Sequence, residues 1–139
     1  MRIGIYCRVS TKNQEDNSSL DSQRELGIEF CKKKGFEYEL YSDTVSGTKV
    51  IRKDLEKLVD KLYRKKLDGF WLYNWDRLSR EKRVMIYFED IVLETKCKIY
   101  VDNIERDIIN NEGDRMDYEF RGLMSNLERM NIKRRMSLG

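Results

Sequence analysis

Hydrophobic and polar positions alternate at the start of the chain. Every second position is apolar, at Ile3, Ile5, Cys7 and Val9. A period of two with β-branched residues is typical of a strand, and the polar residues after it cannot continue a core strand. The pattern predicts a buried first strand with Arg8 and Ser10 at or just past its carboxyl end. Because side chains alternate across a strand, these two side chains are expected on one side.

Alternating helices and strands are expected after this strand. A helix is predicted over about 20–34. Serine hydroxyls before Leu20 can cap its start, and three lysines followed by Gly35 are typical of a helix end. The pattern then predicts a strand over 36–41, followed by an exposed polar loop over 42–49. The next helix carries Leu55, Leu58, Val59 and Leu62 on its apolar face and ends at Asp68-Gly69, before a buried strand over 69–73. A further helix, with Val84, Met85, Phe88, Ile91, Val92 and Thr95 on one face, precedes a strand over 97–101.

This order predicts the fold class. Strands and helices that alternate along a chain form a mainly parallel central sheet with right-handed crossovers. The sequence therefore predicts an α/β domain over residues 1–110, with about four or five strands flanked by helices. A long helix is expected over 111–139, from about Gly113 to Met136, because a seam of apolar residues recurs at spacings of four and three: Met116, Phe120, Leu123, Leu127 and Met130.

Cations without an acid collect near the end of this predicted helix, at Arg129, Lys133, Arg134 and Arg135. A cationic extension beyond an apolar seam is typical of a helix that crosses DNA. It is equally typical of a solvated helix end, where cations interact favourably with the helix dipole. Both interpretations stay open on the residues alone.

Composition narrows the chemistry. The chain has 139 residues, of which 38% are charged and 40% hydrophobic, and this predicts one folded domain with no membrane span. Three widely spaced cysteines (Cys7, Cys31 and Cys97) are expected to be buried hydrophobes in a reducing cytoplasm. No histidine is present, which excludes Ser-His-Asp hydrolysis and histidine-ligated metals. The net charge of +3 is too small to establish a nucleic-acid partner.

Arginines follow two of the predicted strands. Arg8 stands beside Ser10, and a second cluster after the third strand contains Asp76, Arg77 and Arg80. The carboxyl ends of parallel strands meet at one edge, so the clusters can converge around a phosphate. The alternatives are that Ser10 only ends a strand and that Asp76 only pairs with a neighbouring arginine.

These residues carry a resemblance to a known family. The segments are Tyr6-x-Arg8-Val9-Ser10-Thr11, Ser19-Leu20-Asp21-x-Gln23, Asp43-x-x-Ser46-Gly47 followed by Arg52, Asp76-Arg77-Leu78-Ser79-Arg80 and Leu127-Glu128-Arg129. Together they resemble the catalytic domain of serine site-specific recombinases (resolvase/invertase), most closely the large serine integrases. The resemblance covers essentially the whole chain.

The resemblance implies a reaction and its residues. Ser10 would attack a DNA phosphodiester to form a 5′-phosphoserine intermediate, followed by strand exchange and religation, with neither metal nor ATP. Arg8, Arg52, Arg77 and Arg80 match phosphate-binding arginines, and Asp76 matches the active-site acid. The supporting residues would be Tyr6, Gln14, Gln23 and a less constant family lysine, Lys61.

The resemblance also implies partners. The long helix would form dimers, and tetramers in the synaptic complex, and its end would reach the minor groove of double-stranded DNA. Two residues depart from the family pattern: Arg134 stands where Glu is frequent, and Trp75 where Lys is frequent. Family members continue into DNA-binding domains, so we expect a catalytic domain truncated before them.

Two other classes of function are open. A flavodoxin-like module could bind a phosphate or nucleotide at the same edge without catalysis, although the chain lacks a G-x-x-x-x-G-K loop. Saturable binding of a mononucleotide without DNA cleavage would favour it. A structural oligomerisation domain would account for the seam but not for the converging arginines.

Overall fold

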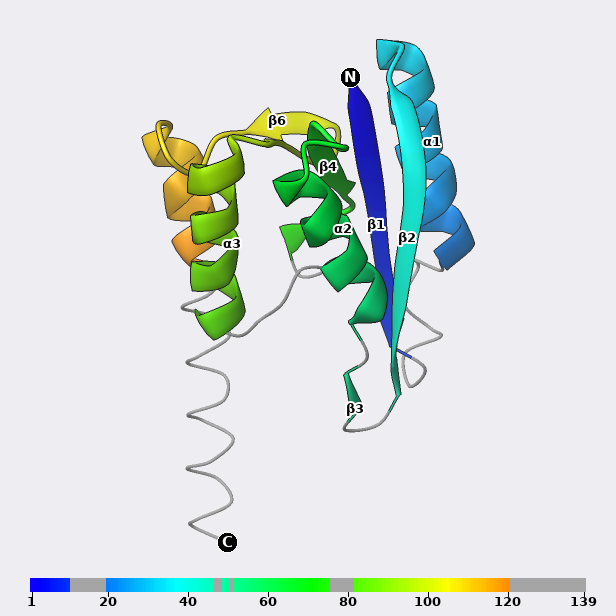
Figure 1. The fold of residues 1–139 in the computed structure, drawn as a ribbon, viewed down its shortest axis with the longest axis horizontal. Coiled ribbons are helices and arrows are strands. Elements are labelled where there is room, and N and C mark those ends of the chain that lie inside the picture. The colour runs from blue at the N-terminus through cyan, green and yellow to red at the C-terminus, as the bar shows by residue number, and fades with distance from the viewer. Residues whose placement is uncertain (11–19, 47–48, 51, 76–81, 121–139) are drawn as a thin grey trace, which may run out of the picture.

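In a computed structural model, a single sheet of six strands lies between helices (Figure 1). The structure describes residues 1–10, 20–46, 49–50, 52–75 and 82–120. The elements are β1 (Arg2–Ser10), α1 (Leu20–Lys34), β2 (Glu37–Ser46), β3 (Lys49–Val50), α2 (Lys53–Tyr63), β4 (Gly69–Leu72), α3 (Lys82–Thr95), β5 (Lys98–Val101) and β6 (Ile104–Arg106). A final helix begins at residue 112 and continues to the end of the described chain at 120.

The sheet is mainly parallel. Its order is β3-β2-β1-β4-β5-β6, and the four central strands run parallel to one another. This confirms the predicted α/β class. The two outer strands are antiparallel additions that the sequence pattern did not reveal. They span only two and three residues, too few for a periodic pattern to register.

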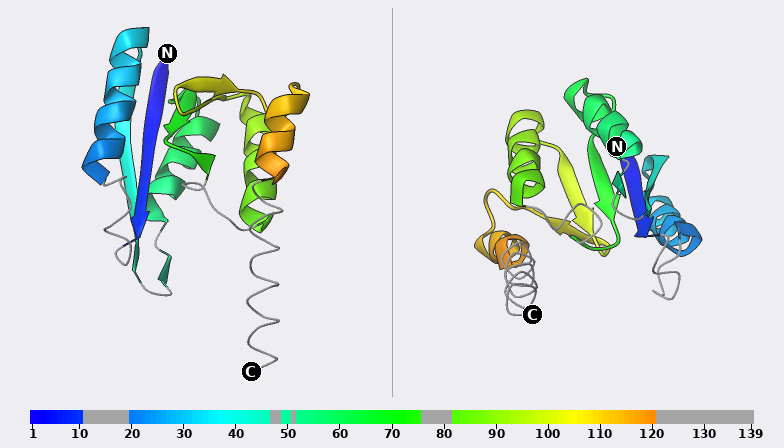
Figure 2. Two further views of the ribbon diagram at one scale, coloured as in Figure 1. Left: turned by 180° about the vertical axis from the view of Figure 1, so that it is seen from behind. Right: turned by 90° about the horizontal axis from the view of Figure 1, so that it is seen from below.

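Each face of the sheet has its own hydrophobic core. On one face, α2 and α3 cover β1, β4 and β5, with Leu58, Leu62 and Ile91 fully buried. On the other face, α1 packs Phe30 and Cys31 against Trp71. The end-on view of Figure 2 shows α1 on the opposite side of the sheet from α2 and α3. Burial from both sides explains why all four residues of β4 are inaccessible and apolar.

Helix α1 lies very close to the sheet at Gly27. A methyl group built there would come within 2.6 Å of Cγ2 of Ile5 and 3.0 Å of the Trp71 ring, so only glycine permits this approach. The helix has the predicted limits, and Gly35 adopts φ = 72° just after its last residue. The close approach places Gln23, one turn before Gly27, against the end of β1.

Two predicted boundaries are wrong. Strand β2 continues to Ser46, so residues 42–46 are not the exposed loop that their polarity indicated, and Asp43 is 5% exposed. Helix α2 ends at Tyr63 rather than at Asp68, and Lys65 adopts φ = 60° two residues later. In β2, partners from other parts of the chain satisfy polar groups that a local pattern treats as solvent-exposed. After α2, the N–H groups of Lys65 and Lys66 instead bind back to Leu62 and Lys61 in a turn.

Candidate active site

A glutamine side chain from α1 binds the main chain near the carboxyl end of β1. Gln23 of α1 is completely buried, its Oε1 accepts a hydrogen bond from the Arg8 N–H, and its Nε2 donates to the Arg8 carbonyl, both at 3.3 Å. One amide thus binds both main-chain groups of one residue, as a neighbouring strand would. Gln23 therefore fixes the backbone two residues before Ser10, where β1 ends.

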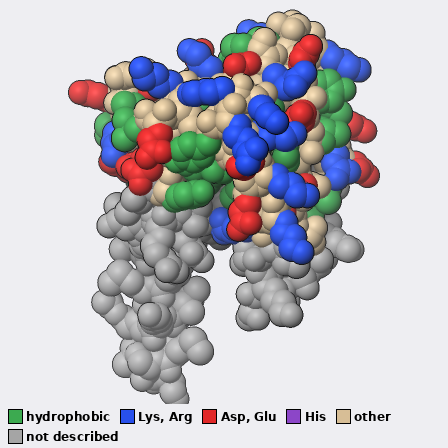
Figure 3. Space-filling model, in the orientation of Figure 1, with side chains coloured by type: hydrophobic (Ala, Val, Ile, Leu, Met, Phe, Trp, Pro, Cys, Tyr) green, Lys and Arg blue, Asp and Glu red, His purple; other side chains and the backbone are tan. Residues whose placement is uncertain are grey.

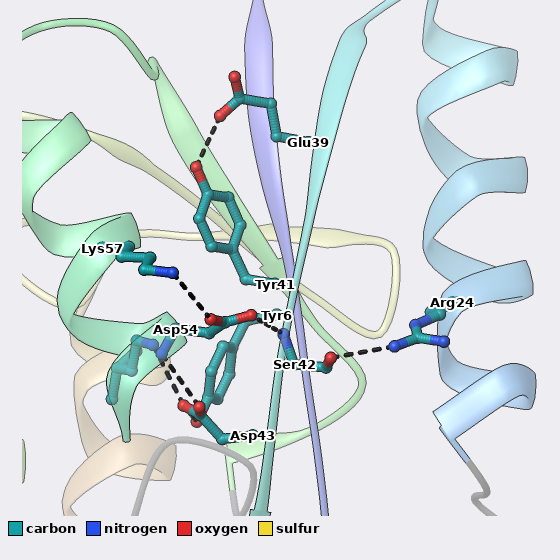
Figure 4. Close-up of polar contacts among 9 residues, drawn as sticks. Tyr6, Arg24, Glu39, Tyr41, Ser42, Asp43, Asp54 and Lys57 are labelled. Carbon is teal, nitrogen blue, oxygen red and sulfur yellow. Dashed lines mark hydrogen bonds and ion pairs between the residues drawn. The ribbon is translucent and has the colours of Figure 1, made fainter. Parts of the chain in front are cut away.

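On the face of the sheet that α2 covers, β1 carries a buried phenol. The Tyr6 hydroxyl donates a 2.8 Å hydrogen bond to Oδ2 of Asp43 (Figure 4). Burial raises the pKa of Tyr6 far above its usual value, the bond to Asp43 raises it further, and the positive charges of Arg8 and Arg52 act in the opposite direction. Tyr6 is consequently a neutral hydrogen-bond donor. Arg8 lies beside Asp43 in the sheet register, and Asp43 accepts N–H groups from the first turn of α2, which Arg52 directly precedes, so Arg8 and Arg52 lie at the same end of the sheet.

Asp43 also caps α2. Its Oδ1 accepts the N–H of Asp54 at 3.0 Å, and its Oδ2 accepts the N–H of Leu55 at 3.1 Å. The connection is reciprocal, since Oδ2 of Asp54 accepts the N–H of Ser42 at 2.9 Å. Unpaired N–H groups of a first helical turn need such acceptors, and the residue before α2, Arg52, supplies no side-chain cap. The cap therefore comes from β2, and it sets where Arg52 enters the helix.

The second arginine cluster follows β4. Strand β4 pairs in parallel with β1, from Ile3 beside Gly69 to Ile5 beside Trp71, so the chain leaves both strands at one edge of the sheet. Several predicted site residues lie outside the described part of the chain: Gln14, Asp76, Arg77, Arg80 and the side chain of Ser10. Their roles stay predictions.

Lys61 lies elsewhere. Its Nζ donates to Oε2 of Glu39 at 3.0 Å, and Oε2 also accepts a 2.6 Å bond from the Tyr41 hydroxyl. The hydrogen bond from Tyr41, followed by that from Lys61, lowers the pKa of Glu39. Glu39 precedes Val45, the partner of Ser10, by six residues, which is about 20 Å along a strand. The Lys61 ammonium is therefore bound beside Tyr41, about 20 Å along the strand from the partner of Ser10.

Comparison with known proteins identifies the family. The family model described as the resolvase N-terminal domain matches residues 3–139. The chain belongs to the resolvase family. None of the curated proteins matches it.

Two solved structures are similar to this resolvase-family domain. A crystal structure of a resolvase family site-specific recombinase from Streptococcus pneumoniae superposes with a TM-score of 0.67 at 18% identity, covering 100% of this chain and 95% of that one. A crystal structure of the C-terminal catalytic domain of ISC1926 TnpA, an IS607-like serine recombinase, gives a TM-score of 0.60 at 30% identity, covering 73% and 70%. The domain is thus a serine recombinase catalytic domain.

The final helix of this resolvase-family domain is anchored to Trp75 and to α3. Trp75, which immediately precedes Asp76, is 6% exposed, and its ring meets that of Tyr118 edge-on at 5.0 Å. Arg106 pairs with Asp114 at 2.8 Å, and Arg115 pairs with Glu89 of α3 at 3.3 Å. The aromatic residue that replaces a frequent family lysine is therefore a packing residue that joins the strand end to the helix.

The helix also presents apolar residues to solvent. Met116 and Phe120 are 69% and 59% exposed, although both are large and hydrophobic. The other predicted seam residues lie beyond the described chain, as do the cations expected to contact DNA: Leu123, Leu127, Met130, Arg129, Lys133, Arg134 and Arg135. Elsewhere, basic and acidic side chains are interspersed over the face that carries α2 and α3 (Figure 3).

The three cysteines contribute to the core and not to the candidate site. Cys7 and Cys31 are buried, Cys97 is half-buried, and burial raises the pKa of Cys31 to about 11. These thiols behave as core hydrophobes, as predicted. Among the helices that the structure describes, none has the length and apolarity needed to cross a membrane.

Proposed function

We propose that this domain cleaves and rejoins double-stranded DNA through Ser10. The Ser10 oxygen attacks a phosphodiester phosphorus, the bond from phosphorus to the 3′ oxygen breaks, and that oxygen leaves with a proton as a free 3′-hydroxyl. The 5′-phosphoserine then stores the energy of the broken bond, so attack by a 3′-hydroxyl restores the DNA and the serine. The supporting facts are membership of the resolvase family over residues 3–139 and a first strand that ends at Ser10.

One observation supports this chemistry most directly. Arg8 lies beside Asp43, which caps the helix that Arg52 directly precedes, at the end of the sheet where β1 reaches Ser10. Guanidiniums grip phosphate oxygens in pairs and stabilise the charge that grows on them during attack. Asp76, Arg77 and Arg80 would complete the group from the end of β4. We further propose that these arginines replace a metal ion, because the chain has no histidine to act as base or ligand.

Buried groups would support the arginines. Gln23 holds the backbone of Arg8 at 3.3 Å, and Asp43 fixes the start of α2 beside Arg52. Preorganised charge of this kind lowers a barrier without reorganisation at the moment of reaction. Tyr6 and Gln23 act as positioning residues in this proposal. Gln14 would join them, and Lys61 would not, because its ammonium is bound to Glu39.

Self-association and DNA contact would involve the final helix. Met116 and Phe120 expose apolar surface that a second subunit would cover, and the seam would continue through Leu123, Leu127 and Met130. The basic residues Arg129, Lys133, Arg134 and Arg135 would then contact the DNA backbone and minor groove. The helix would form dimers, and strands would be exchanged within a tetramer in the synaptic complex.

A covalent adduct tests the proposal. The chain is fused after residue 139 to a DNA-binding domain of known site, and two inverted copies of that site flank a randomised spacer. After denaturation with detergent, protein covalently joined to DNA is quantified on a gel. Ser10→Ala should abolish the adduct, and the neighbouring Thr11→Ala should retain it. Equal adduct from Ser10→Ala would disprove the assignment of the nucleophile.

A further inference from the structure

Strand β2 has an open outer edge along most of its length. The short β3 pairs only with Val45 and Ser46, so among the described residues no strand lies beside 37–44 on that side. Figure 1 shows β2 as the outermost long strand, with β3 beside its lower end only. An exposed edge of this length is a template for pairing with another chain. Pairing would use the main-chain N–H and carbonyl groups that face outward.

The hydrogen bonds identify the outward-facing residues. The N–H of Glu37 binds the carbonyl of Met1 and so faces β1, whereas the N–H of Ser42 faces outward to Oδ2 of Asp54. Main-chain groups alternate along a strand, so Tyr38 and Leu40 face outward like Ser42. Within the described chain, no strand pairs with these two residues at the outer edge. Because Asp54 occupies the N–H of Ser42, the free stretch of the edge centres on Glu39.

The side chains of the free stretch differ between the two faces. On the α1 face, Tyr38 and Leu40 are 37% and 46% exposed. On the α2 face, Glu39 is paired with Lys61 at 3.0 Å. A charged side chain on an edge strand often prevents pairing with another chain. Here that charge, on Glu39, is already paired with Lys61, and the apolar side chains of Tyr38 and Leu40 flank the free main-chain groups.

We propose that two copies of this chain pair through β2, antiparallel, about a two-fold axis at Glu39. In this register Tyr38 lies opposite Leu40 of the second copy, and Leu40 opposite Tyr38. Both are hydrogen-bonded pairs, so about four main-chain bonds form. Each aromatic side chain packs against a leucine across the strands. The two Glu39 residues face each other, and each Lys61 screens its own carboxylate.

This contact differs from the one that the proposed function assigns to the final helix. It requires no DNA and no catalytic residue, so it can fail while the recombinase assignment stands. A register shifted to pair at Leu40 would need the N–H of Ser42, which Asp54 occupies. The cap on Ser42 therefore excludes that shifted register.

Cysteine cross-linking tests the register. In a non-hydrogen-bonded antiparallel pair the Cα atoms are about 4.5 Å apart, within disulfide range, so Glu39→Cys should cross-link to itself across the axis. Two copies of residue 37 would be about 14 Å apart, so Glu37→Cys should not. Both variants are made with Cys97→Ser, which removes the half-buried thiol, and with Phe120→Glu, which disables the exposed seam. Equal yields from both cysteines, or none from Glu39→Cys, would overturn the proposal.

The dissociation constant of the dimer tests the same proposal if Glu39→Cys folds poorly. Sedimentation of the Phe120→Glu chain should give a dissociation constant that Leu40→Glu raises by about tenfold or more. Leu93→Glu is the matched control, because Leu93 is an equally apolar residue, 55% exposed, on α3. Lys61→Met should also weaken the dimer by leaving two facing carboxylates. An unchanged constant for Leu40→Glu, or an equal loss for Leu93→Glu, would contradict pairing through β2.

Discussion

The hydroxyl of Tyr6 donates a 2.8 Å hydrogen bond to Asp43, which lies 37 residues later in the chain. The same carboxylate accepts two N–H groups of the first turn of α2. One buried anion thus joins the end of β1, the middle of β2 and the start of α2. Arg8 and Arg52 enter the site from two of these three elements, so their relative position depends on Asp43.

Asp43→Ala should therefore be much more harmful than Tyr6→Phe. The first change leaves a buried phenol and two helical N–H groups without their acceptor, and we expect a loss of about 3 kcal/mol in the free energy of unfolding. The second removes one donor of three and should cost about 1 kcal/mol. Urea unfolding measures both. Equal losses would show that the carboxylate does not organise this junction.

Gly27→Val should destabilise the fold by forcing α1 away from the sheet. A β-carbon at this position meets Ile5 at 2.6 Å, and overpacking of this kind costs about 1–3 kcal/mol. The displaced helix would also move Gln23 away from Arg8. Gly113→Ala is the control, because its nearest neighbour would be 3.4 Å away on an exposed helix. That change should stabilise the protein by up to about 1 kcal/mol. Thermal unfolding of the two variants in opposite directions is the expected result.

Several elements could be predicted because their signals are local. Serines before Leu20 and a glycine at 35 delimit α1, and the apolar run at 69–72 is long enough to register as a buried strand. Strand β2 could not be delimited in this way. Ser42 and Asp43 are polar because they bind Asp54, Tyr6 and the start of α2, and such partners are visible only after folding.

The sequence predicted some residues of the candidate site and missed others. Arg8 could be placed from the sequence, because it stands near the end of a strand whose pattern is local, whereas Arg52 is brought to the same end of the sheet by the cap that Asp43 provides for α2. The capping role of Asp43 was missed. Its signal was the absence of any capping residue directly before α2, where Arg52 stands. Trp75 gave no local sign that it would contact Tyr118.

Acidification should remove stability that Glu39 supplies. Bonds from Tyr41 and Lys61 lower the pKa of Glu39 in the folded chain. A lowered carboxyl pKa stabilises the fold above the ordinary value of about 4.3, and this contribution disappears as the pH falls through the folded pKa. Glu39→Gln cannot titrate. The difference in unfolding free energy between the two proteins should therefore shrink below about pH 4.3, and a difference independent of pH would contradict the assignment.

Tyr118→Ala should release the final helix. The Tyr118 ring is 2% exposed against Trp75, and loss of a buried aromatic ring costs about 3–5 kcal/mol. Amide hydrogen exchange over 112–120 should accelerate more than exchange in β1. Leu93→Ala is the matched control, because that side chain is 55% exposed on α3, outside the seam, and its removal should leave exchange over 112–120 unchanged. Acceleration spread evenly over the whole domain would indicate general unfolding instead of release of this helix.

The most direct test of the central claim is the mass of one peptide. Adducts formed on DNA are digested with nuclease and trypsin, which cuts after Arg8 and Lys12 and releases Val9-Ser10-Thr11-Lys12. If the account is correct, this peptide carries one nucleotide through a phosphate, fragmentation places it on Ser10, and the matching DNA strand ends in a free 3′-hydroxyl. A nucleotide on Thr11 or on any other peptide, or a cut with a 3′-phosphate, would contradict it.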